Sequence, residues 1–116
     1  MGITFIEASV KNPPSKVEKV RFLVDSGATY SVLPHKTWTK LGLEPKRSVG
    51  VSLADGTLLE RQVADCFMQI AGIEAATPII LGEPGDEALL GLVTLENMGL
   101  VLDPLKRTLQ PIKVRL

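Results

Sequence analysis

An apolar run leads directly into a turn of small and polar residues in the stretch that decides the fold, Phe22-Leu23-Val24-Asp25-Ser26-Gly27-Ala28. Residues 17–24 alternate at period two and then become continuously apolar, which is typical of a strand that ends inside a core. A carboxylate that follows such a strand lies at the mouth of a hydrophobic core instead of on a solvated face. Asp25 is therefore a candidate catalytic residue, and Gly27 leaves room for a second backbone to come close.

The same turn also has a purely structural interpretation. An aspartate at the end of a strand often accepts hydrogen bonds from the backbone amides that follow it, forming an Asx turn. On this interpretation Asp25 only closes a turn, and the protein is a structural β-domain. The rest of the sequence has to decide between the two.

Most of the remaining chain predicts strands. Residues 3–10 alternate loosely, and a turn cluster at residues 12–15 joins them to the strand at 17–24. Further strands are expected at residues 49–54, 57–70, 73–81 and 100–102. A terminal strand over residues 108–116 contains Pro111, which would confine it to an edge or a bulge.

Two short helices interrupt the strands. The first covers residues 35–41, because Pro34 opens it and Gly42 is a plausible C-cap. The second covers residues 92–98. Its predicted apolar face consists of Leu92, Leu95 and Met98.

A projecting hairpin is expected around Asp55-Gly56. This dipeptide favours tight two-residue turns, in which both central residues take positive φ. The flanking strands at residues 49–54 and 57–70 are long enough to carry the turn away from the core.

Composition supports an all-β protein and limits its partners. The 116 residues fit a single domain over residues 1–116, and 45% of them are hydrophobic but only 4% aromatic, so the core must be aliphatic. Thirteen basic residues balance thirteen acidic ones without a basic run, so nucleic acid is not an expected partner. No apolar stretch approaches the roughly 20 residues that span a bilayer. We expect a soluble cytoplasmic protein with no membrane contact.

Neither thiol nor metal chemistry is favoured. Cys66 is the only cysteine, and its apolar surroundings in sequence predict an inert buried thiol. His35 is the only histidine and is expected to be solvated, so a multi-histidine zinc site within one chain is excluded. We expect no metal and no organic cofactor. Trp38 and Tyr30 are expected to anchor packing more than to line a pocket.

Three segments together resemble a known family. Residues 22–28 resemble the active-site segment of the retroviral-type (retropepsin-like) aspartic peptidases and their bacterial and cellular relatives. Leu89-Leu90-Gly91, with the helix up to Gly99, is similar to the second hallmark segment of that family. The hairpin tipped by Ala54-Asp55-Gly56 occupies the place of the family's flap. The three segments lie in the expected order, and the resemblance covers roughly residues 3 to 103.

The resemblance implies a closed, mostly antiparallel β-barrel that acts as a homodimer. The chain itself also needs a second copy for catalysis, because no other aspartate is followed by Ser or Thr and then Gly. A lone carboxylate is ionised at neutral pH and can act as a base, but it cannot return a proton. Two carboxylates a few Å apart share one proton, and aspartic proteases are the standard example of this effect.

The resemblance also assigns roles to the residues of the site. The two Asp25 carboxylates would activate a water for attack on a peptide bond. Ser26 would brace the two loops across the two-fold axis, while Gly27 and Ala28 support the loop and receive substrate backbone. The flap residues Ala54, Asp55 and Gly56 would close over a peptide substrate, and Leu90 and Gly91 belong to the second hallmark segment. An alternative function is a dimer of the same fold that binds extended peptides without cleaving them.

Two positions depart from the viral pattern. Viral members have a substrate-contacting Asp after the active-site segment and an Arg after the hallmark Gly, where this chain has Thr29 and Leu92. Their joint replacement leaves no orphaned charge, so the fold is not threatened, but the viral mode of substrate binding does not carry over. About twelve residues follow the last matched strand, so the termini can join two subunits in a different way.

Overall fold

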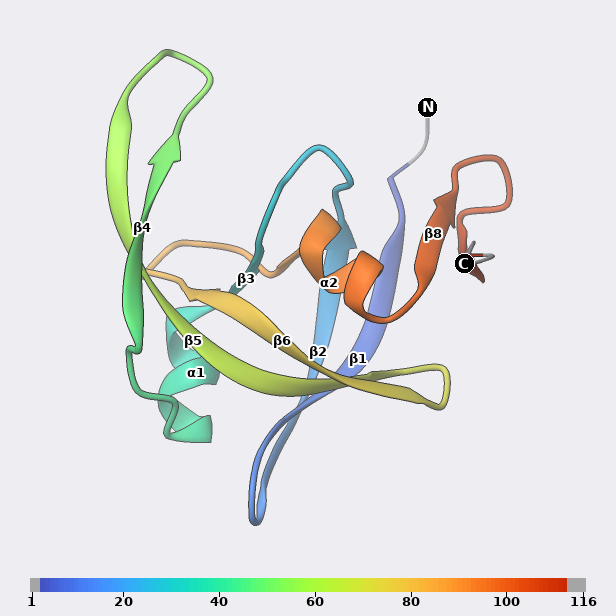
Figure 1. Ribbon diagram of the computed structural model, residues 1–116, viewed down its shortest axis with the longest axis horizontal. Helices are drawn as coiled ribbons and strands as arrows, with labels where there is room; N and C mark the ends of the chain where they lie inside the picture. The colour runs from blue at the N-terminus through green and yellow to red at the C-terminus, as the bar shows by residue number, and fades with distance from the viewer. Residues whose placement is uncertain (1–2, 113–116) are drawn as a thin grey trace, which may run out of the picture.

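The computed structural model describes residues 3–112 of the chain (Figure 1). Within this range there are nine strands and two helices. The strands are β1 (Phe5–Asn12), β2 (Lys16–Val24), β3 (Ser31–Leu33), β4 (Arg47–Ser52), β5 (Leu58–Ile70), β6 (Ile73–Leu81), β7 (Leu89–Leu90), β8 (Leu100–Asp103) and β9 (Thr108–Pro111). The helices are α1 (His35–Leu41) and α2 (Leu92–Asn97).

Seven of the strands form one sheet that closes on itself. Their order is β1-β2-β7-β3-β6-β5-β4, and β1 also pairs with β5. The second pairing joins the two ends of the sheet and leaves only β4 outside the ring, so the predicted closed barrel is confirmed. Pairing is mostly antiparallel, with β2–β7 and β3–β6 as the parallel exceptions.

The length of β5 makes both the closure and the projecting hairpin possible. Its 13 residues pair with β4 through Leu58 to Val63 and with β1 through Phe67 to Gln69. One end of the strand therefore belongs to the barrel wall, while the other end extends away from it with β4 at the upper left of Figure 1. The predicted hairpin is confirmed, with β4 at Arg47–Ser52 rather than at 49–54.

An aliphatic core fills the barrel, as the composition predicts. Alternate residues of β1, β2 and β5 point inward, which is the period-two pattern of a sheet with one buried face. The largest fully buried apolar side chains are those of Phe22, Leu33, Leu41, Met68, Ile79, Leu90 and Leu95. Burial of this apolar surface is the main favourable term in the stability of the fold.

The turn of the β4–β5 hairpin differs from the prediction. Only Gly56 has positive φ, at 87°, whereas Asp55 does not. The N–H of Leu53 donates to the carbonyl of Thr57 at 2.8 Å, and the Gly56 N–H donates to the Leu53 carbonyl at 3.0 Å. The loop therefore has three residues and ends on a left-handed glycine. The Asp55 carboxylate accepts the Thr57 N–H at 2.9 Å, which favours this turn over the expected two-residue one.

Helix α1 has the predicted bounds, and its C-cap Gly42 is left-handed with φ 69°. Helix α2 departs from the prediction in its apolar face. Leu95 and Met98 are buried, but Leu92 is 42% exposed. Leu92 is the first residue of α2, and its side chain lies at the edge of the core. Neither helix within residues 3–112 is long and apolar enough to cross a bilayer.

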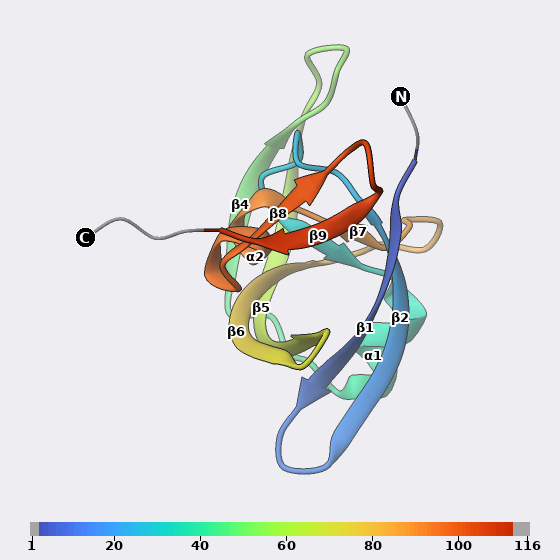
Figure 2. The same ribbon diagram turned by 90° about the vertical axis from the view of Figure 1, so that its right-hand side faces the viewer.

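A small ribbon completes the described chain. Strands β8 and β9 pair only with each other and form a second sheet, which lies beside α2 in Figure 2. The N–H of Ile112 donates to the carbonyl of Gly99 at 2.7 Å and ties the ribbon to the end of α2. Pro111 is the last residue of an edge strand, as expected. The part of the predicted terminal strand beyond residue 112 lies outside the described residues.

Candidate active site

Asp25 is held by backbone hydrogen bonds on both sides of strand β2. Its N–H donates to the carbonyl of Leu90 in β7 at 2.9 Å. One residue earlier, the N–H of Val24 donates to the carbonyl of Thr4 at 2.9 Å. The segment at residues 22–28 and the second hallmark segment at residues 89–91 therefore lie side by side. Asp25 is exposed at the point where the buried strand β2 ends.

The turn after Asp25 is compatible both with a structural role for this residue, as the start of an Asx turn, and with an open carboxylate oxygen. The Gly27 N–H donates to Oδ1 of Asp25 at 3.0 Å, and the Ala28 N–H donates to the Asp25 carbonyl at 3.0 Å. Asp25 does close an Asx turn. Within residues 3–112, however, no hydrogen bond to Oδ2 is found. The turn fixes one oxygen and leaves the other one open for a ligand or a second carboxylate.

Helix α2 fastens the other end of this loop. The N–H groups of Leu92 and Val93 donate to the carbonyls of Ala28 and Thr29 at 2.8 and 2.9 Å. Gly91 is enclosed by the backbone of residues 30 and 31, so this position has no room for a side chain. The second hallmark segment is therefore the support against which the Asp25 loop is built.

A buried chain of hydroxyls lies behind the loop. Oγ of Ser31 accepts the Gly91 N–H at 2.9 Å and lies 2.6 Å from Oγ1 of Thr94, which in turn lies 2.9 Å from Oγ1 of Thr77. All three residues are buried. Sequence reasoning missed this network. Its only signal was that polar residues interrupt apolar segments at three separate places.

A groove separates the Asp25 loop from strand β4. One hollow of about 490 Å³ has Gly27 to Tyr30 on one side and Gly50 to Ser52 on the other, with Val32, Ile80 and Leu89 between them. Tyr30, which the sequence assigned to packing, is half-buried along this groove. Asp25 itself does not line the hollow, which ends at Gly27 beside the exposed carboxylate.

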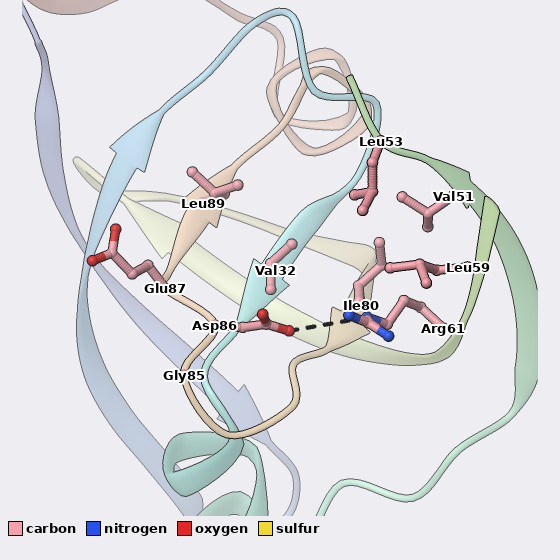
Figure 3. Close-up of a pocket in the computed structure, with 10 residues that line it drawn as sticks. All are labelled: Val32, Val51, Leu53, Leu59, Arg61, Ile80, Gly85, Asp86, Glu87 and Leu89. Carbon is pink, nitrogen blue, oxygen red and sulfur yellow. Dashed lines mark ion pairs between the residues drawn. The ribbon is translucent and has the colours of Figure 1, made fainter. Parts of the chain in front are cut away.

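A second hollow of about 330 Å³ continues the first, and the two share Val32, Val51, Ile80 and Leu89 (Figure 3). Leu53 and Leu59 of the hairpin add to its apolar wall. At one end Arg61 is paired with Glu83 at 3.0 Å and approaches Asp86 at 4.0 Å. The middle of the groove, which the two hollows share, is therefore aliphatic, and the far end of the second hollow is charged. Sequence analysis did not single out Arg61, because its partners are distant in the chain.

The tip of the hairpin stands away from this groove. Ala54, Asp55 and Gly56 are exposed and line neither of the two hollows. Hydrogen bonding by the hydroxyl and the backbone N–H of Thr57 lowers the pKa of Asp55. The tip is thus an ionised, internally hydrogen-bonded turn.

The remaining candidates lie outside the site. Cys66 is buried, and this burial, with the neighbouring Asp65 charge, raises the pKa of its thiol to about 12. His35 is exposed and packs edge-on against Trp38, with ring centroids 5.0 Å apart. Trp38 donates its Nε1–H to the carbonyl of Gly82 at 2.8 Å, as expected of a packing residue. Across residues 3–112, no three His, Cys, Asp or Glu side chains cluster as a metal site would require.

Comparison with known families gives a match over most of the chain. Residues 16–97 match the family described as "gag-polyprotein putative aspartyl protease". The chain belongs to this family. The match includes the Asp25 turn, the β4–β5 hairpin and the whole of α2. Comparison with curated proteins gave no match.

Solved structures of viral proteases have the same fold. The solution structure of the simian foamy virus (mac) protease has 19% sequence identity and a TM-score of 0.58, and the match covers 80% of this chain and 92% of that one. The EIAV protease complexed with the inhibitor HBY-793 has 17% identity and a TM-score of 0.65, with coverage of 99% and 94%. The retropepsin-like β-fold predicted from the sequence is thereby confirmed.

Proposed function

We propose that this chain is an aspartic endopeptidase that hydrolyses extended peptide segments as a homodimer. The observation that carries the proposal is the position of the Asp25 carboxylate, which is exposed, fixed by the Gly27 N–H and located where the groove ends. A second copy related by a two-fold axis near Asp25 would add the other carboxylate and continue the groove.

The chemistry follows from a proton shared by two carboxylates. Their mutual repulsion favours the state in which one Asp25 is ionised and the other protonated. The ionised carboxylate removes a proton from water, whose oxygen attacks the peptide carbonyl, while the protonated carboxyl donates to the carbonyl oxygen. Collapse of the tetrahedral intermediate transfers a proton to the leaving amine, and no acyl-enzyme forms.

The surrounding residues would hold this pair in place. Ser26 would brace the two loops across the axis, and Gly27 and Ala28 would leave space for substrate backbone. Ala54, Asp55 and Gly56 would act as the tip of a flap that closes over the groove and excludes water. Leu90 and Gly91 would position the loop through their backbone contacts.

The neutral pair Thr29 and Leu92, in place of the viral Asp and Arg, supports placement in a bacterial or cellular branch of the family. The second hollow suggests a large apolar side chain as part of the substrate, because Val32, Val51, Leu53, Leu59, Ile80 and Leu89 line it. A cytoplasmic location stays a prediction from the sequence.

Protease assays with Asp25→Asn test the proposal. Wild-type protein should cleave an unstructured polypeptide such as casein best at mildly acidic pH, where a pair of carboxylates keeps its shared proton. Asp25→Asn should lower the rate at least about 100-fold. The fold should survive, because the asparagine oxygen can still accept the Gly27 N–H.

Asp65→Asn is the matched control, since Asp65 is an exposed aspartate on β5. Its rate should equal that of the wild type. Cleavage by Asp25→Asn at the wild-type rate would contradict the proposal, as would cleavage by a strictly monomeric wild type. A wild type that binds labelled peptides but cleaves none between pH 4 and 7 would favour the binding-only alternative.

A further inference from the structure

We infer that the two copies meet through an uncharged surface around Asp25 in which Ile3 and Leu92 pack against the partner. Ile3 and Leu92 are called the apolar frame below. The inference rests on the proposed function, because it assumes that two Asp25 loops come together. It adds the chemical character of the contact and the residues that make it.

Leu92 lies directly beside the Asp25 loop. Its N–H donates to the carbonyl of Ala28 at 2.8 Å, so its backbone is tied to the loop. The side chain is 42% exposed, although Leu95 and Met98 of the same segment are buried. A large part of the Leu92 surface therefore stays in contact with water in the monomer.

Ile3 lies on the opposite flank of the same loop. Strands β1 and β2 pair Phe5 with Leu23, and the bond from the Val24 N–H to the Thr4 carbonyl continues this register. One further step of the antiparallel register places Ile3 alongside Asp25. Ile3 is 65% exposed. In Figure 1 the start of β1 and the loop after β2 lie on the same upper side of the molecule as the tip of the β4–β5 hairpin.

The position of the apolar frame argues for a second copy as its occupant. Two Asp25 carboxylates can share a proton only when they are a few Å apart, which places both flanks of each loop in or next to the interface. Solvent would otherwise reach two large aliphatic side chains beside a catalytic carboxylate. Burial of both in the dimer removes that apolar surface from water.

The charge pattern fits the same occupant. Residues 3–4, 25–29 and 91–93 contain one ionisable side chain, Asp25, in a chain whose charged content is 22%. In a two-fold interface the same patch faces itself, so charges near the axis meet like charges. The one ionisable side chain in these segments is that of Asp25, which the proposed mechanism pairs with the Asp25 of the second copy. Thr29 and Leu92 offer no ion pair between the loops, so apolar packing by the frame would add to the hydrogen bonding proposed for Ser26.

Analytical ultracentrifugation of charged variants tests the inference. Leu92→Asp and Ile3→Asp should each raise the dimer dissociation constant at least about 100-fold, because each places two desolvated charges in the interface. Val17→Asp is the matched control. Val17 is 51% exposed on β2 near the opposite end of the molecule, and its substitution should leave dimerisation unchanged.

Milder variants decide the question if a charged variant does not fold. Leu92→Ala and Ile3→Ala should each weaken the dimer about tenfold. The wild-type dissociation constant should not rise between 0.1 and 1 M NaCl, since an apolar contact has no charges to screen. Weakening of the wild-type dimer by salt would overturn the inference.

The outcomes separate this inference from the proposed function. A wild-type dimer that cleaves peptides and is unaffected by all four frame variants would overturn the apolar frame and leave the homodimeric peptidase standing. A wild type that is monomeric at every concentration and still cleaves peptides would overturn both. Loss of dimer and of cleavage together in the frame variants, but not in Val17→Asp, would support the inference.

Discussion

A methyl group on Gly91 would lie 2.5 Å from the carbonyl carbon of Tyr30 and 2.6 Å from its oxygen. Such contacts are far inside van der Waals separation, so the backbones around residues 30 and 91 would have to move apart. The bonds that α2 makes to the Asp25 loop depend on this close approach. Glycine is therefore required here by packing and not by its φ angle.

Gly91→Ala should lower the free energy of unfolding by about 3 kcal/mol, because overpacking here displaces backbone instead of a flexible side chain. Urea denaturation at one fixed protein concentration measures it. Gly50→Ala is the control, since a Cβ at Gly50 meets nothing within 4 Å. Its effect should stay within about 0.5 kcal/mol, and equal effects of the two substitutions would contradict the packing argument.

Gly27→Ala should affect activity more than stability. A Cβ at Gly27 would lie 3.2 Å from Oδ1 of Asp25, and a small rotation of the exposed carboxylate relieves this contact. If Asp25 is catalytic as proposed, this rotation displaces the oxygens that would react, and a displacement of about 1 Å can cost about 100-fold in rate. We expect kcat/KM on a fluorogenic peptide to fall by about that factor, with an unfolding curve close to that of the wild type. An unchanged kcat/KM would show that the position of Oδ1 tolerates a neighbouring side chain.

The extent to which the sequence predicts this fold depends on how local each signal is. Strand β6 and helix α1 have the predicted bounds, because their limits are set by nearby glycines and by Pro34. Strands β3 and β7 were not predicted as strands. They have three and two residues, too few for periodicity, and they exist only because distant segments pair with them.

In the candidate site, too, features set by local sequence were predicted and features set by distant segments were not. Asp25 and Gly91 were found from local segments, and the structure brings those segments together through the Asp25 N–H bond to Leu90. The Ser31–Thr94–Thr77 network was not predictable, since its members come from three distant segments. The prediction that Leu92 is buried was wrong. The helical spacing of apolar residues shows which face of a helix is apolar, but not how far along the helix that face is covered by the core. The roles of Asp25, Ser26 and the flap residues stay predictions.

Asp55 should titrate below its ordinary value of 3.8, because the Thr57 hydroxyl and backbone N–H stabilise its carboxylate. A lowered folded-state pKa means that the contribution of this hydrogen bonding is present above the unfolded value and is lost as pH falls through the folded one. The hairpin turn should therefore stay intact at mildly acidic pH. NMR titration of the side-chain carboxyl carbon measures the midpoint.

Thr57→Val is the informative variant for this turn, because it removes the hydroxyl and keeps the backbone N–H. The Asp55 midpoint should rise toward 3.8 without returning to it fully. A midpoint at or above 3.8 in the wild-type protein would show that the turn does not form in solution as described.

Cys66 should be unreactive in the folded protein and should make stability fall in alkaline solution. Burial, with a smaller contribution from Asp65, raises its pKa from 9.0 to about 12. Between these values the unfolded chain has lost the thiol proton and the native chain has kept it. Unfolding then releases a proton, so the free energy of unfolding decreases by up to about 1.4 kcal/mol per pH unit as pH rises above 9.

Comparison of the wild type with Cys66→Ala isolates this effect, because lysines and the tyrosine titrate in both proteins. The difference in unfolding free energy between pH 8 and pH 10.5 should be larger for the wild type, although Cys66→Ala itself is less stable at both values through the smaller side chain. Ellman's reagent at pH 8 should label the thiol only in denaturant. Rapid labelling of the native protein would mean that the barrel opens at Cys66, and the two alkaline slopes would then converge.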